Sequence, residues 1–389
     1  MPANLPIISL PVIVAILVFF IMIAIPFLIA FLELARPKDN RPLHIDMFHL
    51  KDAFYFGKSF KKLIESNIGN IEFIDTRGLI RLSKRETIEL ASARTFTRKA
   101  KVNNLLFIAG NLNSEEKVIF SKEIYVKGEC RIGPQNVVRA LYGEKDIRVN
   151  PYGKIARWIC GEGNIAIGAH CLLGRSVAAQ GRLVIDNHCR FQSLSGQPIM
   201  TVNGMPPLSL SDGISCDGFE YPEHQPVKRE PAWKIFRKHV SVNCPVEALY
   251  PKSQPRRPLL DGKQWRVTDS QVRILPDAVI HENFVSRKNL YIGANCTIHG
   301  AVKSFQGIHI GPNAIIHGSV FAEGDIHIGN NCILLGNVFS QSGIRIGNGV
   351  KISRPDTIKS VIGKKRIQLG LNTLIFGYLL TEGIGVVRG

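Results

Sequence analysis

Paired cysteines, acidic residues and N-terminal charge are all scarce in this 389-residue sequence. None of the eight cysteines belongs to a CxxC pair, which argues against a zinc ribbon or a thioredoxin-like redox site. The 31 Asp and Glu residues are outnumbered by 49 Lys and Arg, so the formal net charge is +18. This surplus favours an anionic partner such as lipid head groups or polysaccharide. Because no nucleic-acid recognition motif accompanies the charge, we expect no nucleic-acid partner.

Charge is absent from the whole N-terminal segment as far as Leu32. Residues 7–32 form an apolar run broken only by Ser9, Pro11 and Pro26, which is long enough to cross a bilayer with some tilt. A signal peptide would have a basic start and a shorter apolar stretch. The sequence therefore predicts one transmembrane helix within residues 1–35, with a buried core helix as the alternative.

The positive charges that follow the apolar run predict its orientation. No basic residue precedes the run, whereas Arg36, Lys38 and Arg41 follow it closely. By the positive-inside rule, the remainder of the chain lies in the cytoplasm. We therefore expect a single-pass protein of a bacterial inner membrane, with reduced cysteines.

Residues 36–122 form a basic juxtamembrane region in which we expect a helix and short strands. The helix is predicted from Asp46 to Ser66, with Asp46 as its N-cap. Its Lys58, Lys61 and Lys62 alternate with aromatic residues, a pattern that suits a helix lying on an anionic leaflet. Packing of this helix against the rest of the protein is the alternative. The predicted lipid-binding residues are Arg36, Lys38, Arg41, Lys58, Lys61 and Lys62.

The rest of the chain is a repeat of eighteen residues, divided into three sixes. In most sixes, the first and fifth positions are aliphatic or small. Such a pattern is typical of triangular coils of parallel strands that stack their side chains in columns. The sequence thus predicts a mainly β fold, a parallel β-helix of about nine coils and on the order of 43 Å in length. The rows begin at Val149, Ile167, Ile185, Ile274, Ile292, Ile310, Ile328, Ile346 and Leu369.

This repeat also assigns structural positions to residues that would otherwise resemble functional ones. Cys171, Cys189, Cys296 and Cys332 share one inward position, where free cysteine acts as a small apolar side chain. Asparagines one residue earlier and glycines further on are predicted at corners of the coil. These corner columns are Asn295, Asn313, Asn331 and Gly300, Gly318, Gly336.

Histidines form outward columns at the same spacing. One column contains His281, His299 and His317, and two shorter columns contain His309 with His327 and His170 with His188. Stacked imidazoles could bind a metal or act as a base. They would lie in one line without an accompanying carboxylate column, so we expect no metal site and interpret them as part of the repeat.

Residues 201–268 interrupt the repeat and separate a first β-helix part, residues 123–200, from a second, residues 269–389. This insertion is basic and proline-rich, and it has a short amphipathic stretch around Trp233 and Phe236. An insertion from a repeat array often carries a specific contact. Its Glu223, His224 and His239 are the candidate acid or base residues, although a structured loop remains the alternative.

The last coil ends in the apolar sequence LNTLIFGYLLTEGIGVV, which lacks the polar cap that a repeat array normally needs. An open apolar coil edge favours end-to-end stacking. We therefore expect a homo-oligomer that forms through this tip. The predicted contact residues are Leu374, Ile375, Phe376, Leu379 and Leu380.

Two strings in the repeat, IGPNAIIHGSVFAEGDIHIGNNCILLGNVF and IGAHCLLGRSVAAQGRLVI, resemble the bactofilins, a bacterial family of polymer-forming cytoskeletal proteins. The resemblance implies an uncapped β-helix that joins end to end into filaments without a nucleotide, often at the membrane. It predicts a membrane-anchored scaffold of the bacterial envelope, without a cofactor. Envelope or polysaccharide-synthesis proteins are then the expected partners, and a structural role is expected rather than catalysis.

The six-residue register is similar, too, to the hexapeptide-repeat acyltransferases. That resemblance implies an enzyme with coenzyme A as acyl donor and a catalytic histidine, acting here on a membrane-associated sugar or polysaccharide precursor. His224 and His239 are the histidines outside the coils that could take this role. Loss of acyl transfer on changing either of them would distinguish this alternative from the scaffold.

Overall fold

The computed structural model describes residues 11, 14–23, 25, 52–68, 78–81, 86–204, 240–241, 265–355 and 357–388. The chain divides into two units, Met1–Lys51 and Asp52–Gly389. In the first unit, residues 14–23 are helical and all of their side chains are exposed. None of the helices described combines the length and apolar character needed to cross a bilayer. Most of the span predicted at residues 1–35 lies outside the described residues.

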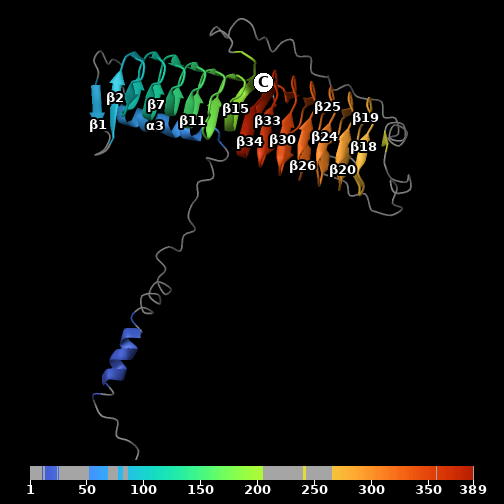
Figure 1. Cartoon of the computed structure of the whole chain (residues 1–389), viewed down its shortest axis with the longest axis horizontal. Helices are drawn as coiled ribbons and strands as arrows, with labels where there is room; N and C mark the ends of the chain where they lie inside the picture. The colour runs from blue at the N-terminus through green and yellow to red at the C-terminus, as the bar shows by residue number, and fades with distance from the viewer. Residues whose placement is uncertain are drawn as a thin grey trace, which may run out of the picture. The chain divides into compact units, whose positions relative to one another are not determined.

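The second unit confirms the parallel β-helix, with about 13 turns. The first solenoid begins with β1, which pairs antiparallel with β2, and continues as parallel coils to β15 (Figure 1). Its strands are β1 (Gly78–Arg81), β2 (Thr87–Ala91), β3 (Arg94–Phe96), β4 (Lys101–Val102), β5 (Leu105–Ile108), β6 (Leu112–Ser114), β7 (Ile119–Val126), β8 (Cys130–Ile132), β9 (Val137–Gly143), β10 (Ile147–Val149), β11 (Lys154–Gly161), β12 (Ile165–Ile167), β13 (Ser176–Ala179), β14 (Leu183–Ile185) and β15 (Arg190–Thr201).

The second solenoid contains the more regular coils. It starts with β17, while β16 pairs antiparallel with β18 at the same end. Its strands are β16 (Val240–Ser241), β17 (Trp265–Thr268), β18 (Val272–Ile274), β19 (Val279–Ile280), β20 (Asn283–Ser286), β21 (Leu290–Ile292), β22 (Thr297–Ile298), β23 (Val302–Ser304), β24 (Ile308–Ile310), β25 (Ile315–Ile316), β26 (Val320–Ala322), β27 (Ile326–Ile328), β28 (Ile333–Leu334), β29 (Val338–Ser340), β30 (Gly343–Ile346), β31 (Lys351–Ile352), β32 (Lys359–Gly363), β33 (Arg366–Leu369) and β34 (Leu374–Val387).

The inward columns lie where the eighteen-residue register predicts them. Ile292, Ile310 and Ile328 are direct neighbours in β21, β24 and β27, and each is at most 4% exposed. The four predicted cysteines are completely buried. The Cys332 thiol donates to the carbonyl of Gly311 at 3.1 Å, so it is a satisfied core group. Because each coil buries its apolar side chains only against the next coil, these columns hold the solenoid together.

The corners of the coils confirm the predicted asparagine and glycine columns. Asn295, Asn313 and Asn331 all have a φ of 55° to 57°, in the left-handed region that asparagine tolerates. The Asn313 amide also donates to the Asn295 side-chain oxygen of the preceding coil, at 3.1 Å. At Gly318, a Cβ atom would lie 2.3 Å from the carbonyl oxygen of Gly300, so only glycine fits this close approach.

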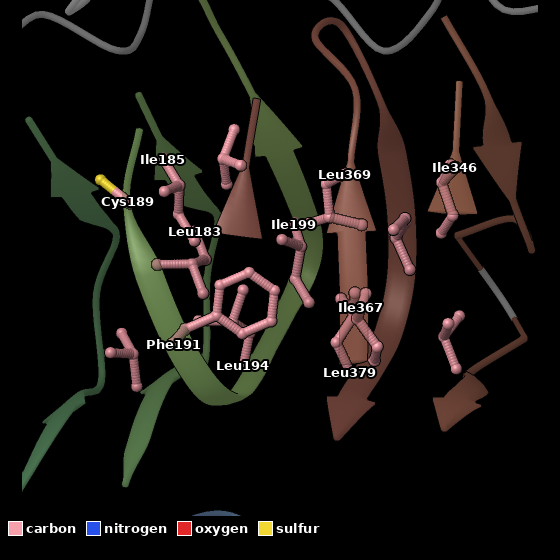
Figure 2. Packing of buried hydrophobic residues seen from close by; sticks show 14 of the residues in the cluster. Leu183, Ile185, Cys189, Phe191, Leu194, Ile199, Ile346, Ile367, Leu369 and Leu379 are labelled. Atoms are coloured by element: carbon pink, nitrogen blue, oxygen red, sulfur yellow. The ribbon is translucent and has the colours of Figure 1, made fainter. Parts of the chain in front are cut away.

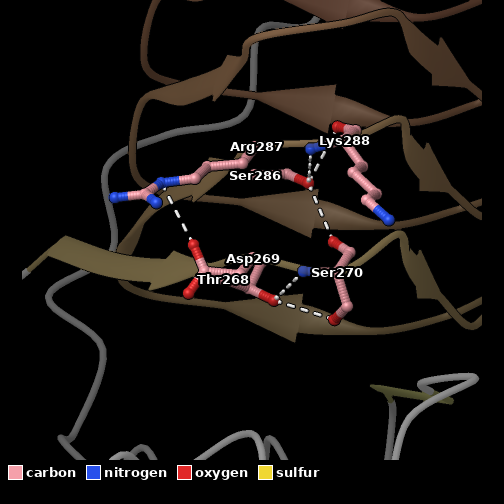
Figure 3. A network of polar contacts seen from close by, with 6 residues as sticks. All are labelled: Thr268, Asp269, Ser270, Ser286, Arg287 and Lys288. Atoms are coloured by element: carbon pink, nitrogen blue, oxygen red, sulfur yellow. Dashed lines mark hydrogen bonds and ion pairs between the residues drawn. The ribbon is translucent and has the colours of Figure 1, made fainter.

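Buried serines line the end of one strand in three coils of the second solenoid, at Ser286, Ser304 and Ser340. Ser286 donates to the carbonyl of Lys288 at 2.8 Å and to that of Ser270 at 3.3 Å (Figure 3). Ser304 repeats the contact to Lys288 one coil later, at 2.8 Å. On the surface of the same corner, the Arg287 and Asp269 side chains form an ion pair of 3.0 Å. The buried hydroxyls satisfy turn carbonyls that the strand ladders leave unpaired.

The two solenoids do not form the single one-directional rod that the sequence predicted. The last strands of both, β15 and β34, lie side by side and pair antiparallel (Figure 1). The second solenoid therefore runs back toward the first, and residues 205–264 link the end of one to the start of the other. The prediction failed because a β-strand edge offers the same backbone donors and acceptors to a parallel or an antiparallel neighbour.

The first solenoid also begins earlier than the predicted boundary at residue 123. Strands β2, β5 and β7 already stack in parallel, with Ala91, Ile108 and Val126 buried inside the coils. Strand β15 ends at Thr201 and β17 begins at Trp265. Bulges such as the register shift between Phe120 and Glu123 hide the period of these early coils in the sequence.

Helix α3 (Tyr55–Ile68) is the described helix of the second unit. It begins at Tyr55 and not at the predicted Asp46, since the Asp52 side chain accepts a hydrogen bond from the Phe54 N–H at 2.9 Å. Residues 46–51 lie outside the described residues. The helix runs along the first solenoid, where Phe60, Ile64 and Ile68 are buried.

Candidate functional site

The contact between β15 and β34, here called the tail-to-tail junction, closes the coils of both solenoids at once. Its register joins Arg190 to Val386, Leu194 to Leu379 and Met200 to Leu374, so paired segments run along all three faces. Two bends in the register, between Phe191 and Ser193 and between Gly196 and Ile199, turn the corners. The contact therefore seals the open edge of each last coil with the edge of the other.

The junction has the character of a two-fold contact within one chain. Both β15 and β34 are single long strands that wrap around three faces of a final coil. The beginning of each strand pairs with the end of the other, as happens when two identical subunits meet across a two-fold axis. The chain thus contains, between its own halves, a contact of the kind that ordinarily joins two molecules.

The core passes through the junction without a break. Figure 2 shows Leu194 and Ile199 of β15 lying beside Ile367 and Leu379 of the second solenoid, and all four are at most 1% exposed. At one corner, the Thr201 and Thr373 hydroxyl oxygens lie 2.8 Å apart. Dispersion and burial along this continuous core stabilise the junction in the same way as the contacts between coils.

This geometry revises the predicted self-association surface. Of its five residues, Leu374, Ile375, Phe376 and Leu379 are at most 4% exposed, and Leu380 is 44% exposed. The buried four pack against the first solenoid of the same chain and are not accessible to a second copy. The reason is the matching apolar edge of β15, which pairs with β34 and covers these residues.

Helix α3 covers one face of the first solenoid, here called the α3 face. Phe60 packs against Tyr125 and Trp158, with ring centroids 6.2 and 5.7 Å apart. Gly57 allows the close approach, since a Cβ atom there would lie 2.3 Å from the Cys160 sulfur. The structure therefore bears out the packed-helix alternative for this segment.

Charges fix the position of α3. Lys61 Nζ lies 2.8 Å from Glu162 Oε1, and Tyr142 donates a second hydrogen bond to the same carboxylate. The bond to Glu162 raises the pKa of Lys61. Burial alone would raise the pKa of Glu162, but the bonds from Lys61 and Tyr142 outweigh it and hold that pKa below its ordinary value. Lys61 thus anchors the helix and does not point to lipid.

Lys58 and Lys62 remain on the outer side of α3. The Lys58 side chain is 63% exposed and pairs with Asp52 at 2.7 Å, and Lys62 is exposed. Both remain compatible with an anionic surface. Arg36, Lys38 and Arg41 lie outside the described residues, as do Glu223, His224 and His239.

A Lys61→Gln variant is expected to loosen α3, because it removes the cation from Glu162. The pair is about one-third exposed, so we expect a loss of about 1 kcal/mol. Hydrogen exchange of the α3 amides at neutral pH should become roughly five-fold faster. Lys62→Gln is the matched control and should leave exchange unchanged. Equal exchange in the two variants would contradict the anchoring role of Lys61.

The same pair gives the docking of α3 a defined pH window. The lowered pKa of Glu162 adds stability above its ordinary value of 4.5, and this stability is lost as the pH falls through the lowered pKa. The raised pKa of Lys61 adds stability below 10.5, which is lost as the pH rises through the raised pKa. Trp158 fluorescence should report loosening of the helix at both limits, and only weakly in Lys61→Gln.

The predicted histidine columns form stacks along the rod. His281 and His299 lie 4.6 Å apart, His309 and His327 lie 4.7 Å apart, and the two rings of each pair are nearly parallel. Burial and the neighbouring His309 lower the pKa of His327, which favours the neutral form of that imidazole. Among the described residues, no group of His, Cys, Asp or Glu is arranged to hold a metal ion.

A basic hollow beside the junction was missed by the sequence analysis. It has a volume of about 330 Å³ and includes Lys154, Arg175 and Arg190, together with apolar atoms of Phe191 and Ile384. No carboxylate lines it, so its chemistry suits an anionic group. Lys154 and Arg190 occupy one column two coils apart, a spacing that could have identified them.

These features form two kinds of surface: a junction that joins two rods, and faces that carry helices or charged groups. Their geometry suits assembly and docking. Comparison of the whole chain with protein-family models, curated proteins and solved structures finds no match.

Proposed function

We propose that this protein is a membrane-tethered, self-associating β-helical scaffold of the bacterial envelope, similar in role to the bactofilins. The N-terminal apolar segment anchors it in the inner membrane, and the rod lies in the cytoplasm. Envelope or polysaccharide-synthesis proteins are the partners that such a rod would organise. The tail-to-tail junction is the observation that carries the proposal.

The junction supports a structural role because it joins two solenoids into one longer rod. Two solenoids meet through three-faced backbone pairing and a continuous core, so one chain forms a stiff body with two outer ends. Both outer ends are starts of a solenoid. Such a rod needs only one further kind of contact, between the first outer end of one copy and the second outer end of the next, to extend into a filament.

The tether is supported by the exposed apolar helix of the first unit. Side chains around its whole circumference are exposed, from Val14 at 53% to Phe20 at 64% and Met22 at 69%. A helix that is apolar all round is stable only inside protein or lipid. We therefore propose the bilayer as its environment, with Lys58 and Lys62 near anionic head groups.

The outer ends offer strand edges for association. Among the described strands, β3 and β4 at one end pair on one side only, and so do β17 and β19 at the other. Open edges are templates for pairing with another chain. In β3, Arg94 donates to Asn111 and Phe96 accepts from Glu115, so the backbone of Thr95 between them points to the open side.

A Thr95→Pro variant tests this association. Proline removes the outward N–H without breaking a hydrogen bond between β3 and β6, and edge strands tolerate it. We expect the full chain in nanodiscs to form rows of rods by electron microscopy, and Thr95→Pro to give single rods. Thr95→Val keeps the N–H and should assemble normally.

Single rods for the unchanged chain would overturn self-association. Rows that persist in Thr95→Pro would overturn the assignment of the first outer end as the contact. The microscopy distinguishes both results from a closed trimer, which is the arrangement implied by the acyltransferase resemblance.

A further inference from the structure

The α3 face continues from the first solenoid into the second. In the first solenoid, this face is formed by the strands whose inward residues stack in line with Leu194. In the second, it is formed by the strands whose inward residues stack in line with Leu379. Leu194 and Leu379 pair with each other in the junction. The residue after each inward residue points outward. In the first solenoid, these outward residues are covered by α3, and they form the column Leu90, Phe107, Tyr125, Tyr142 and Cys160.

The second solenoid has an apolar column at the same position. Phe321 is 37% exposed and follows the inward Val320, as Cys160 follows Ile159. No described element covers this column. Phe305 lies next to it and is 42% exposed. The register places in one line Val267, Val285, Lys303, Phe321, Phe339, Ile362 and Leu380.

The column forms a groove and not a flat surface. A hollow of about 540 Å³ is lined by Val285, Phe305, Phe321 and Phe339, with Glu323 and Gln341 also in its wall. The ring centroids of Phe321 and Phe339 are 6.4 Å apart and the rings are tilted by 48°, so the two side chains form one apolar wall of the hollow. We call this site the phenylalanine groove.

One acidic position of the covered half recurs here, although Lys303 adds a cation to this column. Glu323 follows the inward Val320 by three residues, as Glu162 follows the inward Ile159. In the first solenoid, that glutamate receives Lys61 of the helix at 2.8 Å. A helix placed on the second half in the same way would bring a cation to Glu323.

We propose that the phenylalanine groove binds an amphipathic helix of a partner protein, in the way that the first solenoid binds α3. The helix presents apolar side chains at positions i, i+4 and i+8, as Phe60, Ile64 and Ile68 do, and a lysine or arginine at i+1 that pairs with Glu323. The proposal goes beyond the scaffold role and does not depend on self-association of the rod.

A partner helix explains the groove better than a lipid surface does. The hollow is concave, and its wall carries Glu323 beside Lys303, so it offers no surplus of positive charge to an anionic leaflet. The same face already accepts a helix in the first solenoid, with the same placement of apolar and acidic positions. The groove thus lies on the same face of the rod as an established helix interface.

The test uses a peptide with the sequence of residues 52–68 as a surrogate for the partner helix. The peptide carries a fluorophore at its N-terminus and a benzophenone side chain in place of Phe60. The full chain is held in nanodiscs of neutral phosphatidylcholine. We expect saturable binding by fluorescence anisotropy and photo-crosslinks to residues 303–341.

Two variants test the groove itself. Phe321→Asp should weaken peptide binding at least ten-fold, whereas Tyr152→Asp, which changes an exposed aromatic residue elsewhere, should not change it. Glu323→Lys should weaken binding of this peptide, and a peptide carrying Lys61→Glu should recover it. The Lys61→Glu peptide would not rescue binding if Glu323→Lys weakened it only by disturbing the fold.

Four results would each overturn the proposal. Absence of binding excludes the helix site, and crosslinks to Phe107–Cys160 would mean that the peptide displaces α3. Binding that appears only after Trp233→Asp and Phe236→Asp would mean that the chain's own insertion occupies the groove. Recruitment of anionic vesicles that Phe321→Asp abolishes, without peptide binding, would assign the groove to lipid.

Discussion

A Leu379→Asp variant is expected to open the rod at its centre. Leu379 is completely buried and lies opposite Leu194 in the tail-to-tail junction. Removal of a buried leucine side chain costs about 2–5 kcal/mol, and an unpaired carboxylate in the same place adds to that cost. Water must enter the junction to solvate the charge, so β15 and β34 should separate.

Each solenoid should remain folded in that variant, because its coils stack on one another through their own ladders. Small-angle X-ray scattering should detect a larger radius of gyration. Hydrogen exchange should accelerate in β15 and β34, while β8 and β24 stay protected. We expect this pattern because stability in a repeat array comes from neighbouring coils.

Leu380→Asp is the matched control for this experiment. It introduces the same charge one residue later in β34, at a side chain that is 44% exposed. Scattering and exchange should remain those of the unchanged protein. Identical behaviour of the two variants would contradict the junction, and so would loss of protection in β8 and β24, because the halves would then not fold independently.

An Ile16→Lys, Phe20→Lys double variant is expected to release the protein from membranes. Both residues are at least 49% exposed on the N-terminal helix. A lysine at the centre of a membrane-spanning helix costs about 2.5–3.5 kcal/mol, so two would cost about 5–7 kcal/mol. In flotation assays, the unchanged full chain should rise with neutral vesicles and the double variant should remain at the bottom.

Phe56→Lys is the control for flotation, since Phe56 is exposed on α3 outside the proposed anchor. This variant should float as the unchanged chain does. Salt at about 1 M, which screens surface charge, should not release the unchanged chain. The anchor proposal would fail if the double variant floated normally or if salt alone released the protein.

Much of the fold could be predicted from the sequence because the contacts within a solenoid recur at a short, fixed spacing. Cys296 and Cys332 are buried in the predicted column, and Asn313 donates to Asn295 as a corner ladder requires. The early coils around Ile88 and Ile124 escaped detection, since bulges shift their period. Helix α3 was predicted, but the sequence could not decide whether it contacts lipid or the rest of the protein.

The candidate sites were less predictable. The sequence marked Leu374 and Leu379 as an apolar tip in need of a partner, and the structure supplies that partner as β15 of the same chain. Lys61 looked like any other lysine of the basic helix, because the carboxylate that it meets, Glu162, lies 101 residues away. The phenylalanine groove required knowledge of which face carries α3.

The sequence by itself determined the coil: eighteen-residue rows, inward aliphatic and cysteine columns, and asparagine and glycine corners. Only the tertiary structure decided that the second solenoid runs back to meet the first, and which face of the coils α3 covers. The physical reason is that coil positions are set by side-chain periodicity, which is local in the chain. A final coil edge presents backbone groups that accept a neighbour in either direction, and nothing in its own residues specifies which.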